Sequence, residues 1–238
     1  MKLIPEWKDH QSCLIAWPCN IDLYGSQMNK AKIEMANLAN QISEEEKVYI
    51  YCNEIDYQEC QSIVANKDIS IMKSNLDDSW MRDIAPIFYL DNKTLKSVSF
   101  NFNGYGKYQD FEKDNKISDF ISSQFEIPCS KNNITLEGGA ITYDDNGNLF
   151  TTESVLLNSN RKNQSKEVIE KELIELFDLN KIIWIPNGLE EDDTDGHIDN
   201  IFCPIGNNRY LIASTTLTKT KNSKILEQSK AILKNELN

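Results

Sequence analysis

The chain has 238 residues, and its 37 Asp and Glu outnumber its 25 Lys and Arg, which gives a formal net charge of −12. This balance argues against a protein that binds nucleic acid or an anionic membrane surface, because phosphates are held by clustered Lys and Arg. The longest apolar stretch, residues 13–19, is far shorter than the roughly 20 residues that cross a membrane, and no signal-peptide core begins the chain. We therefore expect a cytoplasmic protein with no membrane partner.

Apolar, β-rich runs alternate with amphipathic stretches from end to end, which favours an α/β fold. The first third of the chain predicts a strand at 12–17, a helix at 27–45, a strand at 47–52, a helix at 54–65 and a strand at 69–72.

The rest of the chain repeats the order strand, turn, strand, helix, strand. The predicted elements are strands at 84–90 and 95–102, a helix at 115–124, strands at 140–143 and 148–152, a helix at 165–177, strands at 181–185, 197–202 and 210–214, and a helix at 223–237. The helices begin about fifty residues apart, as in a repeat architecture. Because each unit needs a neighbour to bury its apolar face, and no strand follows the last helix, we expect a chain about one repeat short.

Cysteine and histidine limit the available chemistry. The six cysteines, at 13, 19, 52, 60, 129 and 203, form no CxxC pair and predict reduced, mostly packed thiols. The chain has two histidines. Acid–base chemistry near neutral pH must therefore use His10, His197 or carboxylates.

Two short segments place carboxylates beside apolar or flexible residues. Three Asp share seven positions with a Trp and an Arg in Asp77-Asp78-Ser79-Trp80-Met81-Arg82-Asp83. A solvated loop is the plain alternative, but such a loop does not need Trp80 and Met81. Further along, Glu137 precedes Gly138 and Gly139, which lets the backbone approach a ligand or form an ordinary bulge.

The strongest local signal is the segment around His197. In an extended strand, residues i and i+2 face the same way, so His197 and Asp199 are predicted to project together beyond Gly196 and an acidic loop. A metal site is the alternative, but no second histidine is near in sequence. His10 precedes the first predicted strand, where we expect a capping or packing role.

These segments resemble those of the agmatine deiminases, which belong with the bacterial peptidylarginine deiminases among the guanidino-group-modifying enzymes. The matching pieces cover essentially the whole chain in family order: Pro5-Glu6-Trp7 with His10, Ala16-Trp17-Pro18, the segment 77–83, Glu137-Gly138-Gly139, Thr151-Thr152-Glu153, the segment 156–161 and Thr194-Asp195-Gly196-His197-Ile198-Asp199-Asn200.

The resemblance implies one domain spanning residues 1–238, built as a pseudo-symmetric α/β propeller of ββαβ-type repeats. It implies hydrolysis of agmatine to N-carbamoylputrescine and ammonia, a step of putrescine synthesis, without a metal or an organic cofactor. Asp83 and Asp199 would grip the guanidinium, Glu137 would orient His197, and His197 would move protons. Trp80 and the loop at Asp193 would border the substrate's chain and its distal amine. A dicationic substrate suits a chain of net charge −12.

The family's nucleophilic cysteine lies in a Gly-rich segment near the C terminus, and the sequence contains no such segment. We therefore expect a C-terminally truncated agmatine deiminase without covalent catalysis. Three alternatives stay open: a guanidine-binding remnant without activity, an inert fragment, and an enzyme acting on peptidylarginine. An incomplete propeller would also expose strand edges, so the chain could form homo-oligomers.

Overall fold

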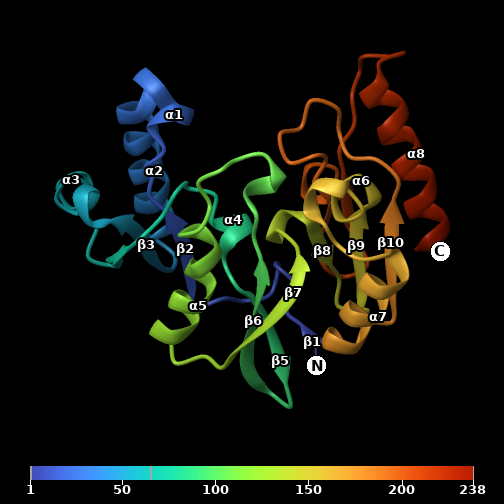
Figure 1. The fold of residues 1–238 in the computed structure, drawn as a ribbon, viewed down its shortest axis with the longest axis horizontal. Helices are drawn as coiled ribbons and strands as arrows, with labels where there is room; N and C mark the ends of the chain where they lie inside the picture. Colours follow the sequence, from blue (N-terminus) through green and yellow to red (C-terminus); the bar gives the residue numbers. More distant parts are fainter. Residues whose placement is uncertain (1, 65, 238) are drawn as a thin grey trace.

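The computed structural model describes residues 2–64 and 66–237 and shows a mixed α/β fold, as the alternating sequence pattern predicts (Figure 1). The strands are β1 (Lys2–Leu3), β2 (Ser12–Ala16), β3 (Lys47–Asn53), β4 (Ile69–Ser74), β5 (Ile87–Asp91), β6 (Thr94–Asn101), β7 (Cys129–Thr135), β8 (Ile141–Tyr143), β9 (Asn148–Thr152), β10 (Lys181–Ile185), β11 (Phe202–Pro204) and β12 (Tyr210–Ile212).

Helices lie between most of these strands. The α-helices are α1 (Ile21–Tyr24), α2 (Met28–Ile42), α3 (Tyr57–Ile63), α4 (Met81–Ile84), α5 (Asp114–Gln124), α6 (Glu153–Leu156), α7 (Lys166–Phe177) and α8 (Lys221–Glu236). The single-turn 3₁₀ helices are η1 (Gly25–Gln27), η2 (Glu54–Asp56), η3 (Gly104–Gly106), η4 (Gly138–Ala140), η5 (Ser159–Arg161) and η6 (Ile198–Asn200).

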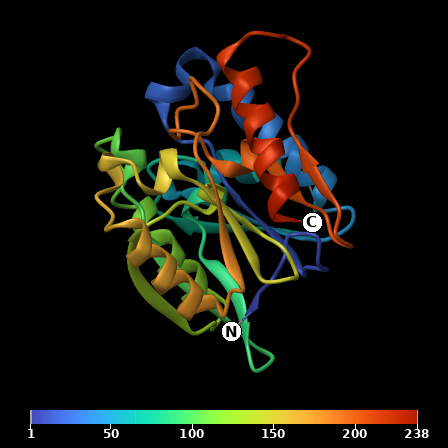
Figure 2. The same cartoon turned by 90° about the vertical axis from the view of Figure 1, so that its right-hand side faces the viewer.

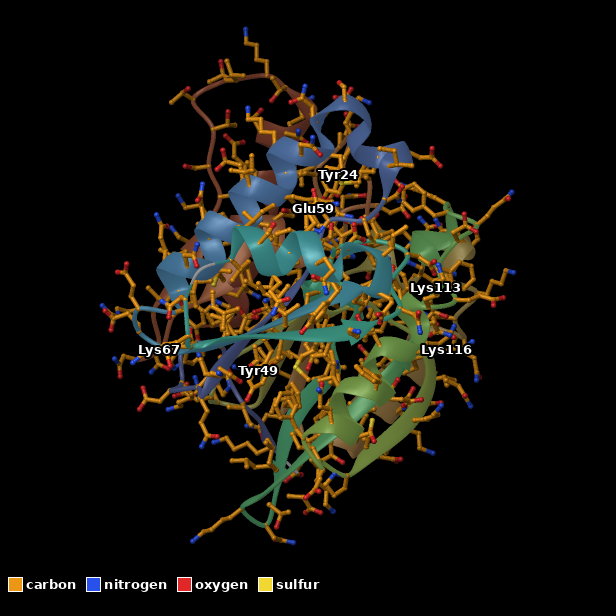
Figure 3. All side chains as sticks on the ribbon, turned by 90° about the vertical axis from the view of Figure 1, so that its left-hand side faces the viewer. Tyr24, Tyr49, Glu59, Lys67, Lys113 and Lys116 are labelled. Atoms are coloured by element: carbon orange, nitrogen blue, oxygen red, sulfur yellow. The ribbon has the colours of Figure 1, made fainter. Side chains whose placement is uncertain are left out.

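The first sheet is parallel, in the order β2-β3-β4, and is covered by α2 and α3. Ala36 and Ala39 of α2 are fully buried against this sheet. Lys32 of the same helix is also buried, because its ammonium donates to Asp56 at 2.8 Å and to Glu59 at 2.5 Å. Figure 3 shows this side of the molecule with Glu59 labelled.

Two further sheets share one order of pairing. In the sheet β1-β5-β6-β7, β5 and β6 are antiparallel, and β7 returns parallel to β6 after α5. In the sheet β10-β9-β8, β8 and β9 are antiparallel, and β10 returns parallel to β9 after α7. The antiparallel pair β11-β12 is followed by α8, which packs on β10 through Leu226 and Leu233 (Figure 2).

Two local expectations are wrong, and the sequence pattern missed one strand. The strand expected at 84–90 begins only at Ile87, because Met81–Ile84 form α4. The helix ends there because the next residue, Ala85, precedes Pro86, and a residue before proline favours an extended backbone. The strand expected at 197–202 is η6 followed by β11. Strand β7 was not expected, because its sequence, Cys-Ser-Lys-Asn-Asn-Ile-Thr, is mostly polar and the strand lies at the edge of its sheet.

The backbone of His197 shows why the strand does not form there. Its N–H donates to side chains of the preceding loop, Asp192 Oδ2 and Thr194 Oγ1, each at 3.2 Å, instead of to a neighbouring strand. Within residues 2–64 and 66–237, no helix is long and apolar enough to span a membrane.

Candidate functional site

Three side chains from distant parts of the sequence meet in front of Gly139. A methyl group built on Gly139 would lie 2.5 Å from His197 Nδ1 and 2.7 Å from both Asp199 Oδ2 and Asp83 Oδ1. The glycine therefore leaves room for two carboxylates and an imidazole to converge. The structure thus brings Asp83, His197 and Asp199 together, although His197 and Asp199 meet through the 3₁₀ turn η6 and not through a strand.

Asp83 is held in a fixed orientation on α4. Its Oδ2 accepts a hydrogen bond from the Tyr105 hydroxyl at 2.8 Å, and its Oδ1 accepts one from the Gly139 N–H at 2.9 Å. Burial raises the pKa of Asp83, although His197 and both hydrogen bonds oppose that effect. Both donors are neutral, so among the described residues no cation is hydrogen-bonded to this carboxylate.

Glu137 lies on the other side of the imidazole. Its Oε2 is 3.6 Å from His197 Nε2, and Asp83 Oδ1 is 3.6 Å from His197 Nδ1. Burial disfavours the imidazolium, but these carboxylates outweigh it and raise the pKa of His197. Burial also works to raise the pKa of Glu137, yet His197 and Arg161 overcome it and lower that pKa. The imidazole is thus biased toward its protonated form beside an ionised glutamate.

Asp199 is the more accessible carboxylate of the cluster. Burial raises its pKa, against the opposing charges of His197 and Arg82. Arg82 Nε lies 3.5 Å from Asp199 Oδ2, while the Nη2 of the same arginine donates to Glu6 Oε1 at 2.7 Å. Glu6 belongs to the Pro5-Glu6-Trp7 segment, so the start of the chain contacts the cluster through Arg82.

Trp80 and Asp193 are not part of this cluster. Trp80 directly precedes α4 and is 47% exposed. Asp193 is exposed, and its backbone oxygen accepts a hydrogen bond from Lys107 at 2.6 Å. The expectation that both residues border a ligand stays a prediction.

The acidic segment that precedes Trp80 is fastened to α5 and is not a solvated loop. The Asp114 carboxylate accepts the N–H groups of Asp77 and Asp78 at 2.9 and 3.1 Å. Asp77 Oδ2 in turn accepts the Lys113 N–H at 2.8 Å, and Figure 3 labels Lys113 at this end of α5. Burial, with the nearby Asp77 and Asp78, raises the pKa of Asp114 to about 7.

Arg161 and Tyr105 support the site, and the residue patterns did not single them out. Arg161 is fully buried and donates to Glu137 at 2.7 Å. Its only sequence signal is a place within the segment 156–161, where nothing in the spacing marks it as buried. Tyr105 is signalled only by the flanking glycines, and it adopts a positive φ of 58°.

The other candidate groups lie elsewhere. His10 is exposed and contacts Glu46 Oε2 at 2.6 Å. Within the described residues, no three His, Cys, Asp or Glu side chains are placed to hold a metal ion. The six cysteines are unpaired, and Cys52 and Cys60 are buried in the core under α2 and α3.

Residues 2–238 match the family model for the Porphyromonas-type peptidyl-arginine deiminases. The chain belongs to this family. The agmatine deiminase of Stutzerimonas stutzeri is 31% identical over 236 residues, covering 96% of this chain and 64% of that protein. The agmatine deiminase of Pseudomonas aeruginosa strain UCBPP-PA14 is 30% identical over 218 residues, covering 88% of this chain and 59% of that protein. This chain therefore spans less than two thirds of these relatives.

A solved agmatine deiminase has the same fold. The C. jejuni agmatine deiminase with a C315S substitution, solved with substrate bound, superposes with a TM-score of 0.88 at 29% identity, covering 99% of this chain and 71% of that one. The resemblance drawn from the sequence motifs is confirmed, and with it the assignment to a family of hydrolases.

Proposed function

We propose that this chain binds the guanidinium group of agmatine in front of Gly139. The agmatine deiminase reaction to which this binding belongs is the hydrolysis of agmatine to N-carbamoylputrescine and ammonia, a step toward putrescine. The observation that carries this proposal is the approach of Asp83, Asp199 and His197 to one point beside Gly139. A guanidinium is a planar cation with paired N–H donors, and each pair matches the two oxygens of a carboxylate.

The proposed roles follow from the surroundings of each group. Asp83 and Asp199 accept the guanidinium N–H groups, since both are partly desolvated carboxylates. His197 moves the protons, because its pKa is raised and it lies between two carboxylates. Glu137 orients the imidazole. Trp80 and Asp193 border the aliphatic chain and the distal ammonium of agmatine.

Turnover also needs a thiolate to attack the guanidine carbon. Burial raises the pKa of Cys203, and the nearby Glu6 and Asp199 add to that effect, while its thiol donates to Pro204 O at 3.5 Å. Burial also raises the pKa of Cys13, and raises that of Cys19 to about 12. We expect the 238-residue chain to bind agmatine and to release no ammonia from it.

The fold of the binding unit is part of the same proposal. The shared pairing order of β5-β6-β7 and β8-β9-β10 supports a pseudo-symmetric α/β propeller forming one domain over residues 1–238. One domain should unfold in urea in a single transition that near-UV and far-UV circular dichroism report together. Two separated transitions would contradict it.

The decisive experiment is calorimetric titration of the 238-residue chain with agmatine, methylguanidine and putrescine. Agmatine and methylguanidine are expected to bind, and putrescine, which lacks the planar donors, is not. Trp80→Ala and Asp193→Asn should weaken agmatine binding and leave methylguanidine binding unchanged. Failure of the folded chain to bind either guanidine would remove the proposal. Ammonia release above the buffer rate would refute the expectation of no turnover.

A second candidate is peptidylarginine, because the matching family model is that of peptidyl-arginine deiminases. Titration with an N-acyl-arginine amide separates the two candidates. Tighter binding of this compound than of agmatine would transfer the assignment to peptidylarginine.

A further inference from the structure

A buried arginine outside the proposed binding cluster holds together the supports of that cluster. Arg161 is fully buried. Its guanidinium donates to Glu137 Oε1 at 2.7 Å, to Asp195 Oδ2 at 2.6 Å, to the Tyr105 carbonyl at 2.7 Å, to Asn160 Oδ1 at 2.9 Å and to the Thr194 carbonyl at 3.0 Å.

We propose that Arg161 is a positioning residue, which sets the orientation of Glu137 and the proton affinity of His197. The inference rests on the proposed function in one respect only: that function is what requires His197 to move protons. Arg161 lies behind Glu137, so it acts through that glutamate and not on a substrate.

The direct route runs through the two oxygens of Glu137. Arg161 Nε occupies Oε1, which turns Oε2 toward His197 Nε2 at 3.6 Å. In the described residues, Glu137 Oε2 and His197 Nε2 are buried without a hydrogen-bond partner. These two atoms are thus left facing each other, and a small closing movement makes them a hydrogen bond.

Two indirect routes reach the other members of the cluster. Arg161 donates to the backbone oxygen of Tyr105, whose hydroxyl holds Asp83. It also donates to the backbone oxygen of Thr194, whose Oγ1 accepts the N–H of His197. One guanidinium therefore contacts Glu137 directly, and at the same time the residues that hold Asp83 and His197, which a Lys ammonium, a compact point charge, cannot reproduce.

The electrostatic consequence has a definite sign. His197 is faced by the carboxyl groups of Asp83, Glu137 and Asp199, and by the Tyr105 ring, whose centroid lies 6.1 Å away. Arg161 offsets the charge of Glu137. Removing that positive charge leaves Glu137 paired with the imidazole alone, so the proton on the pair is held more tightly and the titration midpoint of His197 rises.

The two histidines of the chain make this measurable by NMR, with His10 as an internal reference and His10→Gln to assign the signals. Arg161→Gln is expected to raise the midpoint of His197 by at least about half a pH unit while the His10 midpoint stays fixed. Arg161→Lys, which keeps the charge, should raise it by less. Lys131→Gln removes an exposed charge paired with Asp119 and serves as the matched control, with no shift expected.

An unchanged His197 midpoint in folded Arg161→Gln overturns the proposal. If that variant does not fold, Asp195→Asn decides. The neutral amide no longer offsets Arg161, so the guanidinium acts more strongly on Glu137, and the His197 midpoint is expected to fall. A midpoint that stays fixed or rises in Asp195→Asn overturns the proposal. The titration uses no guanidine ligand, so its outcome is independent of whether agmatine binds.

Discussion

Replacing Gly139 by alanine adds one methyl group at the point where the proposed site converges. The backbone of Gly139 does not have a positive φ, so an L-residue is accommodated there without backbone strain. The effect of Gly139→Ala therefore comes from the methyl group itself, which would lie 2.5 Å from His197 Nδ1 and 2.7 Å from an oxygen of each aspartate.

The magnitude follows from these distances. Real Cβ contacts essentially never fall below 3.0 Å, so the imidazole must retreat by about 0.5 Å and the two carboxylates by about 0.3 Å. The displacement of the imidazole reaches the ~0.5 Å tolerance of a binding constellation, and both carboxylates are displaced at the same time. A charge-assisted hydrogen bond contributes about 1.5–3 kcal/mol, so losing one costs more than about tenfold in agmatine affinity. Overpacking should also reduce the free energy of unfolding by about 1–3 kcal/mol.

Titration calorimetry measures the affinity, and urea unfolding measures the stability. Gly147→Ala is the matched control: Gly147 has a φ of 79°, so alanine is strained there, and its nearest contact is Asn180 at 3.2 Å, away from the cluster. This control should lose stability and keep agmatine affinity. Gly139→Ala binding agmatine as tightly as the unmodified chain would show that the three convergent groups do not form the binding surface.

Three further outcomes are expected. Asp83→Asn and Asp199→Asn should each weaken guanidine binding by more than about 1.5 kcal/mol in the same titration, because each removes a charge-assisted pair. Unchanged affinity in both variants would contradict the assignment of these two residues to the binding site. Agmatine affinity should rise with pH, because a bound cation favours the deprotonated forms of Asp83, Asp199 and His197, whose pKa values are all raised. Calorimetry in two buffers of different ionisation enthalpy should show that binding releases protons. Proton uptake on binding would contradict this prediction. The pKa of Asp114 is about 7 in the folded chain, above its unfolded value, so the free energy of unfolding should fall as pH rises from about 4 to about 7. Urea titrations of Asp114→Asn should show a weaker decline over this range. A decline identical to that of the unmodified chain would contradict the assignment to Asp114.

Local pattern was sufficient for most elements. Strand β3 alternates in hydropathy, and α7 carries apolar residues at helical spacing, so both were located to within about two residues. The hydropathy pattern did not predict the structure where side chains compete with a neighbouring strand for the backbone hydrogen bonds. The expected strand at 197–202 fails because the Asp192 side chain accepts the His197 N–H, a choice that depends on how the acidic loop folds back.

The candidate site divides in the same way. His197 and Asp199 could be selected from their spacing in a chain with two histidines, whereas the choice of Asp83 within its acidic segment came from the resemblance to the agmatine deiminases. Arg161 could not, because its importance lies in four acceptors from three distant segments: the Tyr105 carbonyl, Glu137, and the Thr194 carbonyl with the adjacent Asp195 carboxylate. A single arginine in sequence carries no sign of such long-range partners.

The distribution of charge around the site supports the proposal of a cationic ligand. Arg161 balances Glu137, and Asp195 is also paired with Lys107 at 2.9 Å. Within the part of the chain that the structure describes, Asp83 receives hydrogen bonds only from neutral donors. Asp199 meets Arg82 at 3.5 Å, and that arginine is hydrogen-bonded to Glu6. Two adjacent carboxylates are therefore left short of positive charge beside an imidazole that cannot satisfy both. Because burying unbalanced anions is unfavourable, this arrangement supports the proposal that the site binds a cation reaching both aspartates together, which a planar guanidinium does and a single ammonium does less well.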